Sequence, residues 1–183
     1  MQQKDKLRKL YLNKRKKYYY DVDKNFFSPL LKLIRKRINK KHIKIALYYP
    51  SNFELNVLKI LELKYFTGQT ILLPVTEKNN LMKFFLWKKN EVLVVNKFGL
   101  LEPIKVKVKI PDVILIPLLA FDKDKFRLGY GKGYYDRYLN KYIKQYKDIM
   151  TIGVAFSFQK HHKLPINHND AKLDFILTEK GIY

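Results

Sequence analysis

The sequence predicts an α/β fold, in which helices cover both faces of a mainly parallel sheet. Apolar runs at residues 42–49 and 70–75 enclose a stretch of helical character at 53–66. Strand, helix and strand within about 35 residues form a βαβ unit, which places the two strands parallel in one sheet. A third apolar run, at 113–116, does not alternate with polar residues, which is typical of a central strand buried on both faces.

Length and composition set broad limits on function. At 183 residues, with 47% hydrophobic and 30% charged residues, the composition is that of a globular protein, and we expect a single domain over residues 1–183. The absence of cysteine excludes disulfides and thiol catalysis and fits a cytoplasmic location. The N-terminal sequence lacks the apolar segment of a secretory signal. The sequence also has no run of about 18 apolar residues, so we expect no membrane span.

The formal net charge of +22 indicates attraction to anions but does not select among them. Nucleic acid, anionic lipid and phosphorylated small molecules are all attracted by such a chain. Lys, Asn, Ile, Tyr and Phe are frequent, and all five have A/T-rich codons. We therefore favour compositional drift over selection for a polyanion as the origin of the charge.

Periodicity and capping residues predict the remaining elements. Residues 2–20 form a helix with Leu7, Leu10 and Tyr11 on one face, and its charge alone indicates a solvated basic helix. Ser28 followed by Pro29 is typical of a helix cap and a first helical residue, and this second helix runs to about residue 39. The other expected elements are strands at 81–87 and 92–95 that form a hairpin, a turn at 98–103, a segment at 104–110 that would be half exposed if it is a strand at all, a helix at 135–146, a strand at 151–156, a polar turn at 165–170 and a strand at 175–178.

The stretch from Arg127 to Asp136, RLGYGKGYYD, carries the clearest chemical pattern. Its alternate glycines let backbone N–H groups face an anion, and the first turn of the following helix adds unpaired N–H groups. Arg127 and Lys132 can pair with phosphate oxygens, and Asp136 can hold a cation that bridges phosphates. The spacing matches neither GxxxxGK[ST] nor GxGxxG, so a flexible loop with a solvated lysine remains the alternative.

Several further segments make a joint pattern that is far more specific than the glycine loop. They are Lys4-x-x-Leu7-Arg8 with Arg15, the segment 49–54, the FGLLEP turn at 98–103, LLAFD at 118–122, the loop at 127–136, and Leu164-Pro165, Asn169-Asp170 and Leu173-Asp174. In this order and spacing they resemble the 5-formyltetrahydrofolate cyclo-ligase (5,10-methenyltetrahydrofolate synthetase) family. The chain departs from that pattern at Leu118, where glycine is common, and at Val75, where arginine is common.

The resemblance implies a three-layer Rossmann-like fold and an ATP-dependent ring closure. Mg-ATP would phosphorylate the formyl oxygen of 5-formyltetrahydrofolate, and the N10 nitrogen would attack the activated carbon. Phosphate would then leave, giving 5,10-methenyltetrahydrofolate, ADP and phosphate. We accordingly expect ATP and 5-formyltetrahydrofolate as substrates, Mg²⁺ as cofactor, a monomer, and no specific nucleic-acid or membrane partner.

The resemblance also implies roles for individual residues. The ATP-binding residues would be Lys4, Arg8, Arg127, Leu128, Gly129, Tyr130, Gly131, Lys132, Gly133, Tyr134 and Tyr135. The folate-binding residues would be Tyr49, Glu54, Tyr130, Gly131, Lys132, Gly133 and Tyr134. Lys132 and Arg127 would be catalytic, with Lys132 stabilising charge on the transferring phosphoryl group. Asp136 and Asp170 would hold Mg²⁺, and Asp174 is left open as the alternative to Asp170.

Two alternatives remain from the residues alone. Glu54 could simply complement the dipole of the helix expected at 53–66. The whole chain could be a basic nucleic-acid-binding module that uses charge and stacking aromatics. Against the second reading, no RNP, KH or zinc-finger signature is present, and the aromatics at 134–146 follow helical spacing. We place the site at the carboxyl ends of the strands, where the loops after Tyr49 and Pro117 meet.

Overall fold

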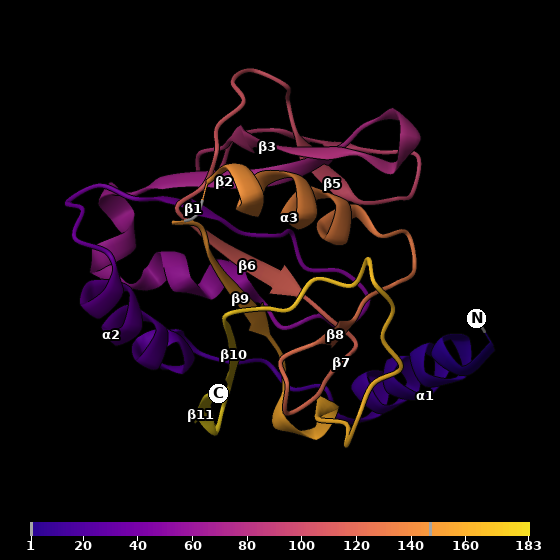
Figure 1. Cartoon of the computed structure of the whole chain (residues 1–183). Coiled ribbons are helices and arrows are strands. Elements are labelled where there is room, and N and C mark those ends of the chain that lie inside the picture. Colours follow the sequence, from indigo (N-terminus) through magenta and orange to yellow (C-terminus); the bar gives the residue numbers. More distant parts are fainter. Residues whose placement is uncertain (1, 147) are drawn as a thin grey trace.

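The computed structural model describes residues 2–146 and 148–183. Its centre is a seven-stranded sheet with the strand order β11-β10-β9-β6-β1-β2-β3 (Figure 1). The strands are β1 Lys44–Ala46, β2 Thr70–Thr76, β3 Met82–Leu86, β6 Val113–Pro117, β9 Met150–Val154, β10 Phe175–Thr178 and β11 Gly181–Ile182. Strands β2, β1, β6, β9 and β10 pair in parallel, and only the edge strands β3 and β11 are antiparallel to their neighbours.

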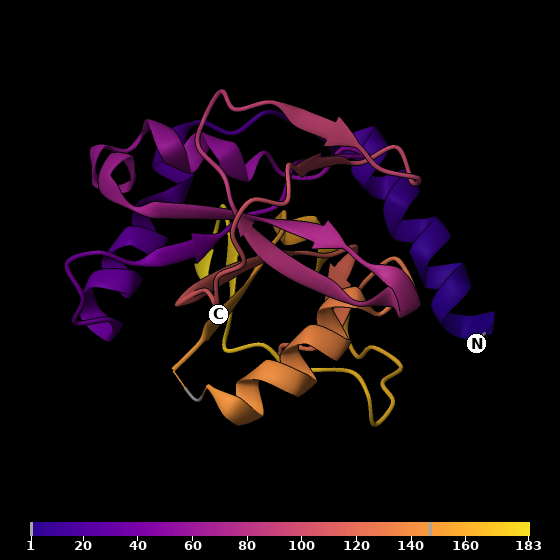
Figure 2. The same cartoon turned by 90° about the horizontal axis from the view of Figure 1, so that it is seen from above.

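Helices cover both faces of this sheet (Figures 1 and 2). The α-helices are α1 Gln2–Tyr18, α2 Ser28–Arg37 and α3 Tyr134–Gln145, and the 3-10 helices are η1 Lys24–Phe27, η2 Val57–Glu62, η3 Lys64–Gly68, η4 Lys78–Asn80 and η5 Ser157–Gln159. One core joins the sheet to α2, η2 and η3, and a second core joins the opposite face to α3. The three-layer α/β fold predicted from the sequence is confirmed.

The central strand β6 shows why the two cores form. Val113 and Leu115 belong to the core under α2, whereas Ile114 and Ile116 belong to the core under α3. Successive side chains of a strand point to opposite faces, so an unbroken apolar run contributes to both. All four residues have no exposed surface, which confirms the prediction of a central, fully buried strand.

The α-helix predicted at 53–66 is wrong in its start and its type, because the segment begins with a non-helical turn and then forms the 3-10 helices η2 and η3. Asn52 and Phe53 have φ angles of 47° and 61°, and a right-handed helix cannot include left-handed residues. The chain instead turns sharply, and the side chain of Asn56 accepts a hydrogen bond from the Leu58 N–H to begin the 3-10 helix η2. Glu54 therefore lies in an irregular turn and not in the first turn of an α-helix.

The predicted hairpin between 81–87 and 92–95 is also wrong. Strand β3 pairs with β2, and β4 (Leu93–Val95) pairs with β5 (Leu101–Pro103). Asn96 fixes the turn between β4 and β5, because its Oδ1 accepts from the N–H groups of Phe98 and Leu100 at 2.8 and 3.0 Å. The segment 104–110 forms no strand and is joined to β3 by an isolated bridge between Phe85 and Val108.

Two smaller expectations also change. Helix α2 begins at Ser28 itself, with Phe27 in the capping position, so Ser28 is not the cap. Strands β7 (Ala120–Phe121) and β8 (Arg127–Leu128) form a hairpin that the sequence did not indicate. The buried carboxylate of Asp122 stabilises this hairpin by accepting from two N–H groups within it and from the N–H of Leu164.

The strand order reverses between β1 and β6. The chain passes from β1 to β2 and β3 on one side, and later adds β6, β9 and β10 on the other. In open α/β sheets, a ligand crevice forms outside the carboxyl ends of the strands at such a reversal. Helix α1 lies beside this end of the sheet, where Tyr11 packs with Leu119 and Leu128 (Figure 1). Within residues 2–146 and 148–183, no helix is long and apolar enough to cross a membrane.

Candidate active site

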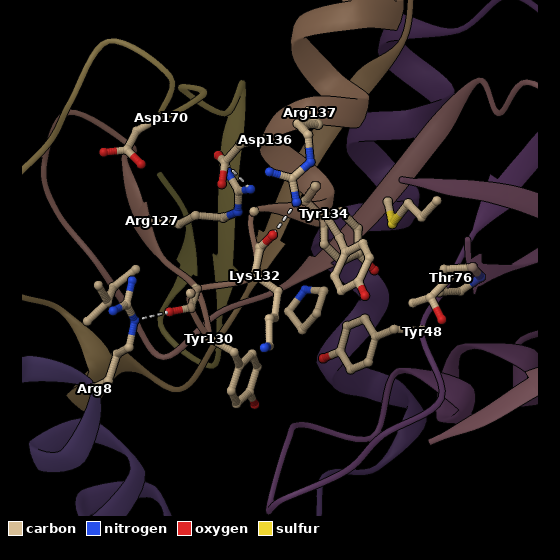
Figure 3. Close-up of a pocket in the computed structure, with 18 of the residues that line it drawn as sticks. Arg8, Tyr48, Thr76, Arg127, Tyr130, Lys132, Tyr134, Asp136, Arg137 and Asp170 are labelled. Atoms are coloured by element: carbon tan, nitrogen blue, oxygen red, sulfur yellow. Dashed lines mark hydrogen bonds and ion pairs between the residues drawn. The ribbon is translucent and has the colours of Figure 1, made fainter. Parts of the chain in front are cut away.

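A cleft of about 1360 Å³ opens at the carboxyl ends of β1 and β6 (Figure 3). Its walls come from α1, the turn after β1, the β4–β5 hairpin, the glycine loop with the start of α3, and the segment 165–170. Tyr49 and Pro117 both line it, so the cleft lies where the sequence predicted. The cleft gathers every predicted site residue, namely Lys4, Arg8, Tyr49, Glu54, Arg127, Leu128, Gly129, Tyr130, Gly131, Lys132, Gly133, Tyr134, Tyr135, Asp136 and Asp170.

The glycine loop runs directly into α3. Gly133 occupies the capping position of α3 with a φ of 67°, and Gly131 has a φ of 98°, both in the left-handed region that favours glycine. A Cβ at Gly131 would lie 3.2 Å from Cζ of Arg8, and one at Gly133 would lie 3.0 Å from Nη1 of Arg137. Each of these glycines thus lies in a tight turn beside an arginine side chain. A loop of this kind is suited to binding an anion.

Helix α1 brings two cations to this loop. Nε of Arg8 donates to the carbonyl oxygen of Gly129 at 3.0 Å, and Nη1 of Arg8 pairs with Asp5 at 2.5 Å. Nζ of Lys4 pairs with Oδ2 of Asp170 at 2.5 Å across the end of the cleft. The first helix therefore reaches the loop, as the sequence pattern implied.

Arg127 and Lys132 have different surroundings. The side chain of Arg127 is 4% exposed; its Nη2 pairs with Oδ1 of Asp136 at 2.9 Å, and its Nη1 donates to the carbonyl oxygen of Ala171 at 3.2 Å. Lys132 is exposed, and its Nζ lies 5.9 Å from the ring centre of Phe98. The described residues offer its ammonium no hydrogen bond or ion pair, so Lys132 is the cation best placed to meet a phosphate.

Glu54 provides a buried carboxylate on the other side of the cleft. It is 7% exposed, and its Oε2 accepts from the N–H and Oγ of Ser51 at 2.9 and 3.3 Å. Its Oε1 accepts from the hydroxyl of Tyr130 at 2.6 Å. Burial raises the pKa of Glu54, and the hydrogen bond from Tyr130 and the charge of Arg15 offset only part of that rise.

Tyr130 joins the glycine loop to this carboxylate. Its residue surface is 42% exposed, but its hydroxyl end lies between Glu54 and the guanidinium of Arg15. Burial raises the pKa of Tyr130 well above the ordinary value, so the hydroxyl stays protonated and donates. Tyr49 stands at the rim with 36% exposure, where its ring can pack on a flat ligand.

A family model described as the 5-formyltetrahydrofolate cyclo-ligase family matches residues 1–179. This chain belongs to that family. A 5-formyltetrahydrofolate cyclo-ligase of Mycoplasma genitalium is 34% identical over 184 residues, which cover 97% of this chain and 98% of the relative. One of Haemophilus influenzae is 29% identical over 179 residues, 94% of this chain and 93% of the relative.

Solved structures of the cyclo-ligase family agree with the fold. A 5,10-methenyltetrahydrofolate synthetase from Mycoplasma pneumoniae matches with a TM-score of 0.69 and 28% identity, covering 95% of this chain and 97% of that one. The NMR structure of the Aquifex aeolicus 5,10-methenyltetrahydrofolate synthetase matches with a TM-score of 0.73 and 30% identity, covering 98% and 91%. The family resemblance seen in the sequence is thus confirmed over nearly the whole chain.

The two carboxylates expected to hold Mg²⁺ in this cyclo-ligase family member lie at one edge of the cleft (Figure 3). Oδ1 of Asp136 also accepts from the N–H of Ala171 at 3.1 Å, and Ala171 directly follows Asp170. The contacts of Asp136 use Oδ1, and those of Asp170 use Oδ2, which also accepts from Asn167 N–H at 2.7 Å. Among the described residues, Oδ2 of Asp136 and Oδ1 of Asp170 have no hydrogen-bond partner, so each carboxylate could offer one oxygen to a cation.

This donor set fits Mg²⁺ held jointly with a nucleotide. Mg²⁺ in such sites takes one or two carboxylates and completes its shell with phosphate oxygens and water. No group of three or more His, Asp or Glu side chains suited to a metal occurs in 2–146 and 148–183, so an all-protein cage is not what these residues build.

Asp174, the alternative to Asp170, lies outside the cleft lining. Its Oδ2 accepts from the N–H and Oγ1 of Thr151 at 2.8 and 2.7 Å, and the Asp174 N–H donates back to Oγ1 at 2.9 Å. This reciprocal pair secures the start of β9. Of the two aspartates, Asp170 therefore lies at the cleft and Asp174 does not.

Both departures from the cyclo-ligase pattern are accommodated. Leu118 is 1% exposed and packs in the core under α3, where Gly153 leaves room for it: a Cβ at Gly153 would lie 2.8 Å from Cδ2 of Leu118. Val75 is 1% exposed and points away from the cleft, whereas its neighbours Pro74 and Thr76 line it. Neither residue alters the cleft wall.

Sequence reasoning gave no role to several residues at this site. Glu102 is buried, and its Oε1 accepts from the N–H and Oγ1 of Thr76 and from Asn96, which ties the β4–β5 hairpin to β2. Arg15 is 1% exposed, although α1 was expected to be a solvated basic helix. A signal for Arg15 existed: it lies four residues after the buried Tyr11, on the same helical face.

Proposed function

We propose that this chain catalyses the ATP-dependent conversion of 5-formyltetrahydrofolate to 5,10-methenyltetrahydrofolate, with ADP and phosphate as the other products. One observation carries the proposal in this family member. A single cleft holds a glycine loop with the exposed ammonium of Lys132 and, joined to that loop through Tyr130, the buried carboxylate of Glu54. A triphosphate and a pteridine can therefore occupy adjoining parts of one space.

The ATP side consists of the glycine loop, the start of α3 and the cations of α1. Backbone N–H groups of the loop and of the first turn of α3 bind phosphate oxygens, helped by the positive end of the helix dipole. Lys4 and Arg8 of α1 neutralise phosphate charge beside the loop. Lys132 stabilises the charge that develops on the transferring phosphoryl group, and Arg127 holds Asp136 and the loop in place.

The folate side consists of the turn 49–54 and the outer part of the glycine loop. Tyr49 packs on the pteridine, and Glu54 accepts from its N–H groups. Because Glu54 is buried, a hydrogen bond to its charge is strong and directional. The contact from Glu54 to Tyr130 sets the distance between the pteridine and the loop that carries Lys132.

Positioning is the main demand of the reaction. The formyl oxygen attacks the terminal phosphorus of ATP, and the bond from that phosphorus to the ADP oxygen breaks. The N10 nitrogen then bonds to the formyl carbon and gives up its proton, and the bond from that carbon to the phosphorylated oxygen breaks with release of phosphate. No step needs a nucleophilic side chain, which suits a chain without cysteine. When bound by Asp136 and Asp170, Mg²⁺ supplies charge neutralisation at the phosphates.

An absorbance assay for the methenyl product tests the proposal. The purified chain should form product only when 5-formyltetrahydrofolate, ATP and Mg²⁺ are all present, with one ADP released per product. Product formation without ATP, or ATP hydrolysis that ignores the folate, would refute it.

We further propose that the chain acts as a cytoplasmic monomer without a specific nucleic-acid or membrane partner. Sedimentation at working concentration gives the oligomeric state directly. RNA binding that competes with ATP would favour the nucleic-acid alternative, whereas weak, salt-sensitive binding is expected of any chain with a charge of +22.

A further inference from the structure

Arg15 of α1 is buried under the cleft, with 1% of its surface exposed. Its Nη2 donates to the carbonyl oxygen of Asn52 at 2.6 Å and to the hydroxyl of Tyr130, and its Nη1 donates to the carbonyl oxygen of Leu118 at 3.3 Å. The three partners belong to the turn after β1, the glycine loop and the loop after β6. One side chain thus connects α1 to all three loops at the carboxyl edge of the sheet.

The turn that Arg15 holds is strained. Asn52 and Phe53 both adopt left-handed φ angles; asparagine tolerates this conformation, but for the bulky Phe53 it costs free energy and persists only where the surroundings impose it. The hydrogen bond from Arg15 to Asn52 O is one such constraint, and the edge-on contact between Tyr19 and Phe53 is another. This turn sets the direction of Glu54, whose N–H donates to the carbonyl oxygen of Ser51 at 2.9 Å.

Arg15 also decides where the proton of Tyr130 points. A tyrosine hydroxyl donates one hydrogen bond and accepts others. Since the guanidinium can only donate, Tyr130 accepts from Arg15 and its proton is left for Oε1 of Glu54. The chain of contacts therefore has one direction, from Arg15 through Tyr130 to Glu54.

We propose that Arg15 is a positioning residue for the folate side of the reaction: it holds Asn52 and Tyr130 together so that Glu54 meets the pteridine in a fixed orientation. The inference rests on the function proposed above and deepens it. Arg15 itself does not line the cleft, so it would act through its partners and not by touching a substrate.

Its hydrogen bonding suits a positioning role better than a purely stabilising one. Nε of Arg15 is buried and finds no partner in the part of the chain that the structure describes. A buried donor without a partner costs free energy. The position of the guanidinium therefore favours the hydrogen bonds of its two Nη atoms, although Nε is left without one. A lysine has one nitrogen and cannot reproduce the fork that meets Asn52, Leu118 and Tyr130.

The guanidinium also acts on the charge of Glu54. The polar groups around this carboxylate are Ser51 within its own turn, Arg15 from α1, Tyr130 from the glycine loop, and the hydroxyl-bearing side chains of Tyr48 after β1 and Tyr135 of α3. Arg15 is the cation among them and lowers the pKa of Glu54, against the larger effect of burial. Without it, Glu54 would take up a proton at higher pH and lose its charge for the pteridine.

Steady-state kinetics of Arg15→Lys and Arg15→Gln test the inference, with Arg35→Lys as the matched control on the exposed surface of α2. We expect KM for 5-formyltetrahydrofolate to rise about tenfold or more in both variants, while KM for ATP stays within about threefold, because the charge-assisted contacts that are lost hold Asn52 and the Tyr130 hydroxyl beside Glu54. The acid limb of kcat/KM for the folate should move to higher pH in Arg15→Gln and much less in Arg15→Lys, which keeps the charge. Arg35→Lys should match the wild type.

A double-mutant cycle with Tyr130→Phe separates positioning from general destabilisation. If Arg15 acts through the Tyr130 hydroxyl, the effects on folate KM should be strongly non-additive, so that Arg15→Lys adds little in the Tyr130→Phe background. Thermal unfolding of each variant shows that it is folded before its kinetics are read.

Three results would overturn the inference. They are a folded Arg15 variant with an unchanged folate KM, a double variant whose effects simply multiply, and failure of both Arg15→Lys and Arg15→Gln to fold, which would make Arg15 a structural residue. Absence of ring closure in the wild type would instead remove the proposed function itself, so the two failures are distinct.

Discussion

The hydroxyl of Tyr130 donates to Oε1 of Glu54 at 2.6 Å, although 76 residues separate the two in the sequence. This contact joins the glycine loop to the turn after β1 and makes one cleft out of two loops. The parts expected to bind nucleotide and folate are therefore in direct contact. Comparing KM for ATP with KM for the folate shows on which part a substitution acts more strongly.

Lys132→Ala should lower kcat about 10²- to 10³-fold, since removal of one group that stabilises transition-state charge typically costs that much. The fold should be unaffected, because the Lys132 ammonium makes no hydrogen bond or ion pair with the described residues and its side chain is exposed. Turnover and thermal unfolding are measured together. The control is Lys123→Ala, which removes the same charge from an exposed site outside the cleft lining and should keep full activity. Near-normal turnover in Lys132→Ala would contradict the role assigned to Lys132.

Gly131→Ala should raise KM for ATP and lower the free energy of unfolding by about 1–2 kcal/mol, the cost of a left-handed residue with a Cβ. The added methyl group would also meet the guanidinium of Arg8 at 3.2 Å. Gly68→Ala is the control, because its Cβ would have no neighbour within 4 Å and its φ is not positive. Chemical denaturation gives the free energy of unfolding, and ATP titration gives KM for ATP. Equal values for Gly131→Ala and Gly68→Ala would show that the left-handed φ of Gly131 and its contact with Arg8 do not matter.

Asp136→Asn and Asp170→Asn should each raise the Mg²⁺ concentration for half-maximal activity about tenfold or more, since each removes a charged oxygen ligand. Asp174→Asn should leave the Mg²⁺ requirement unchanged and lower the unfolding temperature, because Asp174 secures Thr151 at the start of β9. Activity is titrated with Mg²⁺ at saturating ATP. A normal requirement in Asp170→Asn with a raised one in Asp174→Asn would reverse the assignment.

Glu54 should give the ligand-free protein a specific pH dependence. Burial raises the pKa of Glu54 above 4.5, so the folded chain binds this proton more tightly than the unfolded chain. The ionised carboxylate is therefore unfavourable above the folded pKa, and its contribution to stability improves as the pH falls from the folded pKa to about 4.5.

Urea titrations of wild type and Glu54→Gln measure this contribution, because the other titrating groups are common to both. The unfolding free energy of the wild type minus that of the variant should rise as the pH is lowered from about 7 to about 4.5. A difference that falls over this range would mean that the pKa of Glu54 is lowered in the folded chain.

Much of the layered architecture could be predicted from local patterns. An unbroken apolar run such as 113–116 has few alternatives to a central strand, and strand β2 (Thr70–Thr76) lies where the sequence placed it. The glycine loop was recognisable because its positions combine backbone freedom with charge. The family pattern then placed distant residues such as Lys4 and Asp170 in one site, which local reasoning could not do.

What the sequence did not reveal depends on tertiary contacts. The turn at 52–53 is held by a guanidinium from α1, and helical periodicity at 53–66 carries no sign of it. The pairing of β3 with β2 instead of β4 depends on which open sheet edge is near, and two short strands in sequence do not determine that choice. Buried charge on Arg15 could be suspected only from its place on the face of α1 that carries Tyr11.

The ion pair between Lys4 and Asp170 joins residues 166 positions apart and closes one end of the cleft. During synthesis, helix α1 leaves the ribosome long before Asp170 exists, so this ion pair can form only after strands β1 to β9 have been translated. The central strands of the sheet can therefore pair before this contact is made.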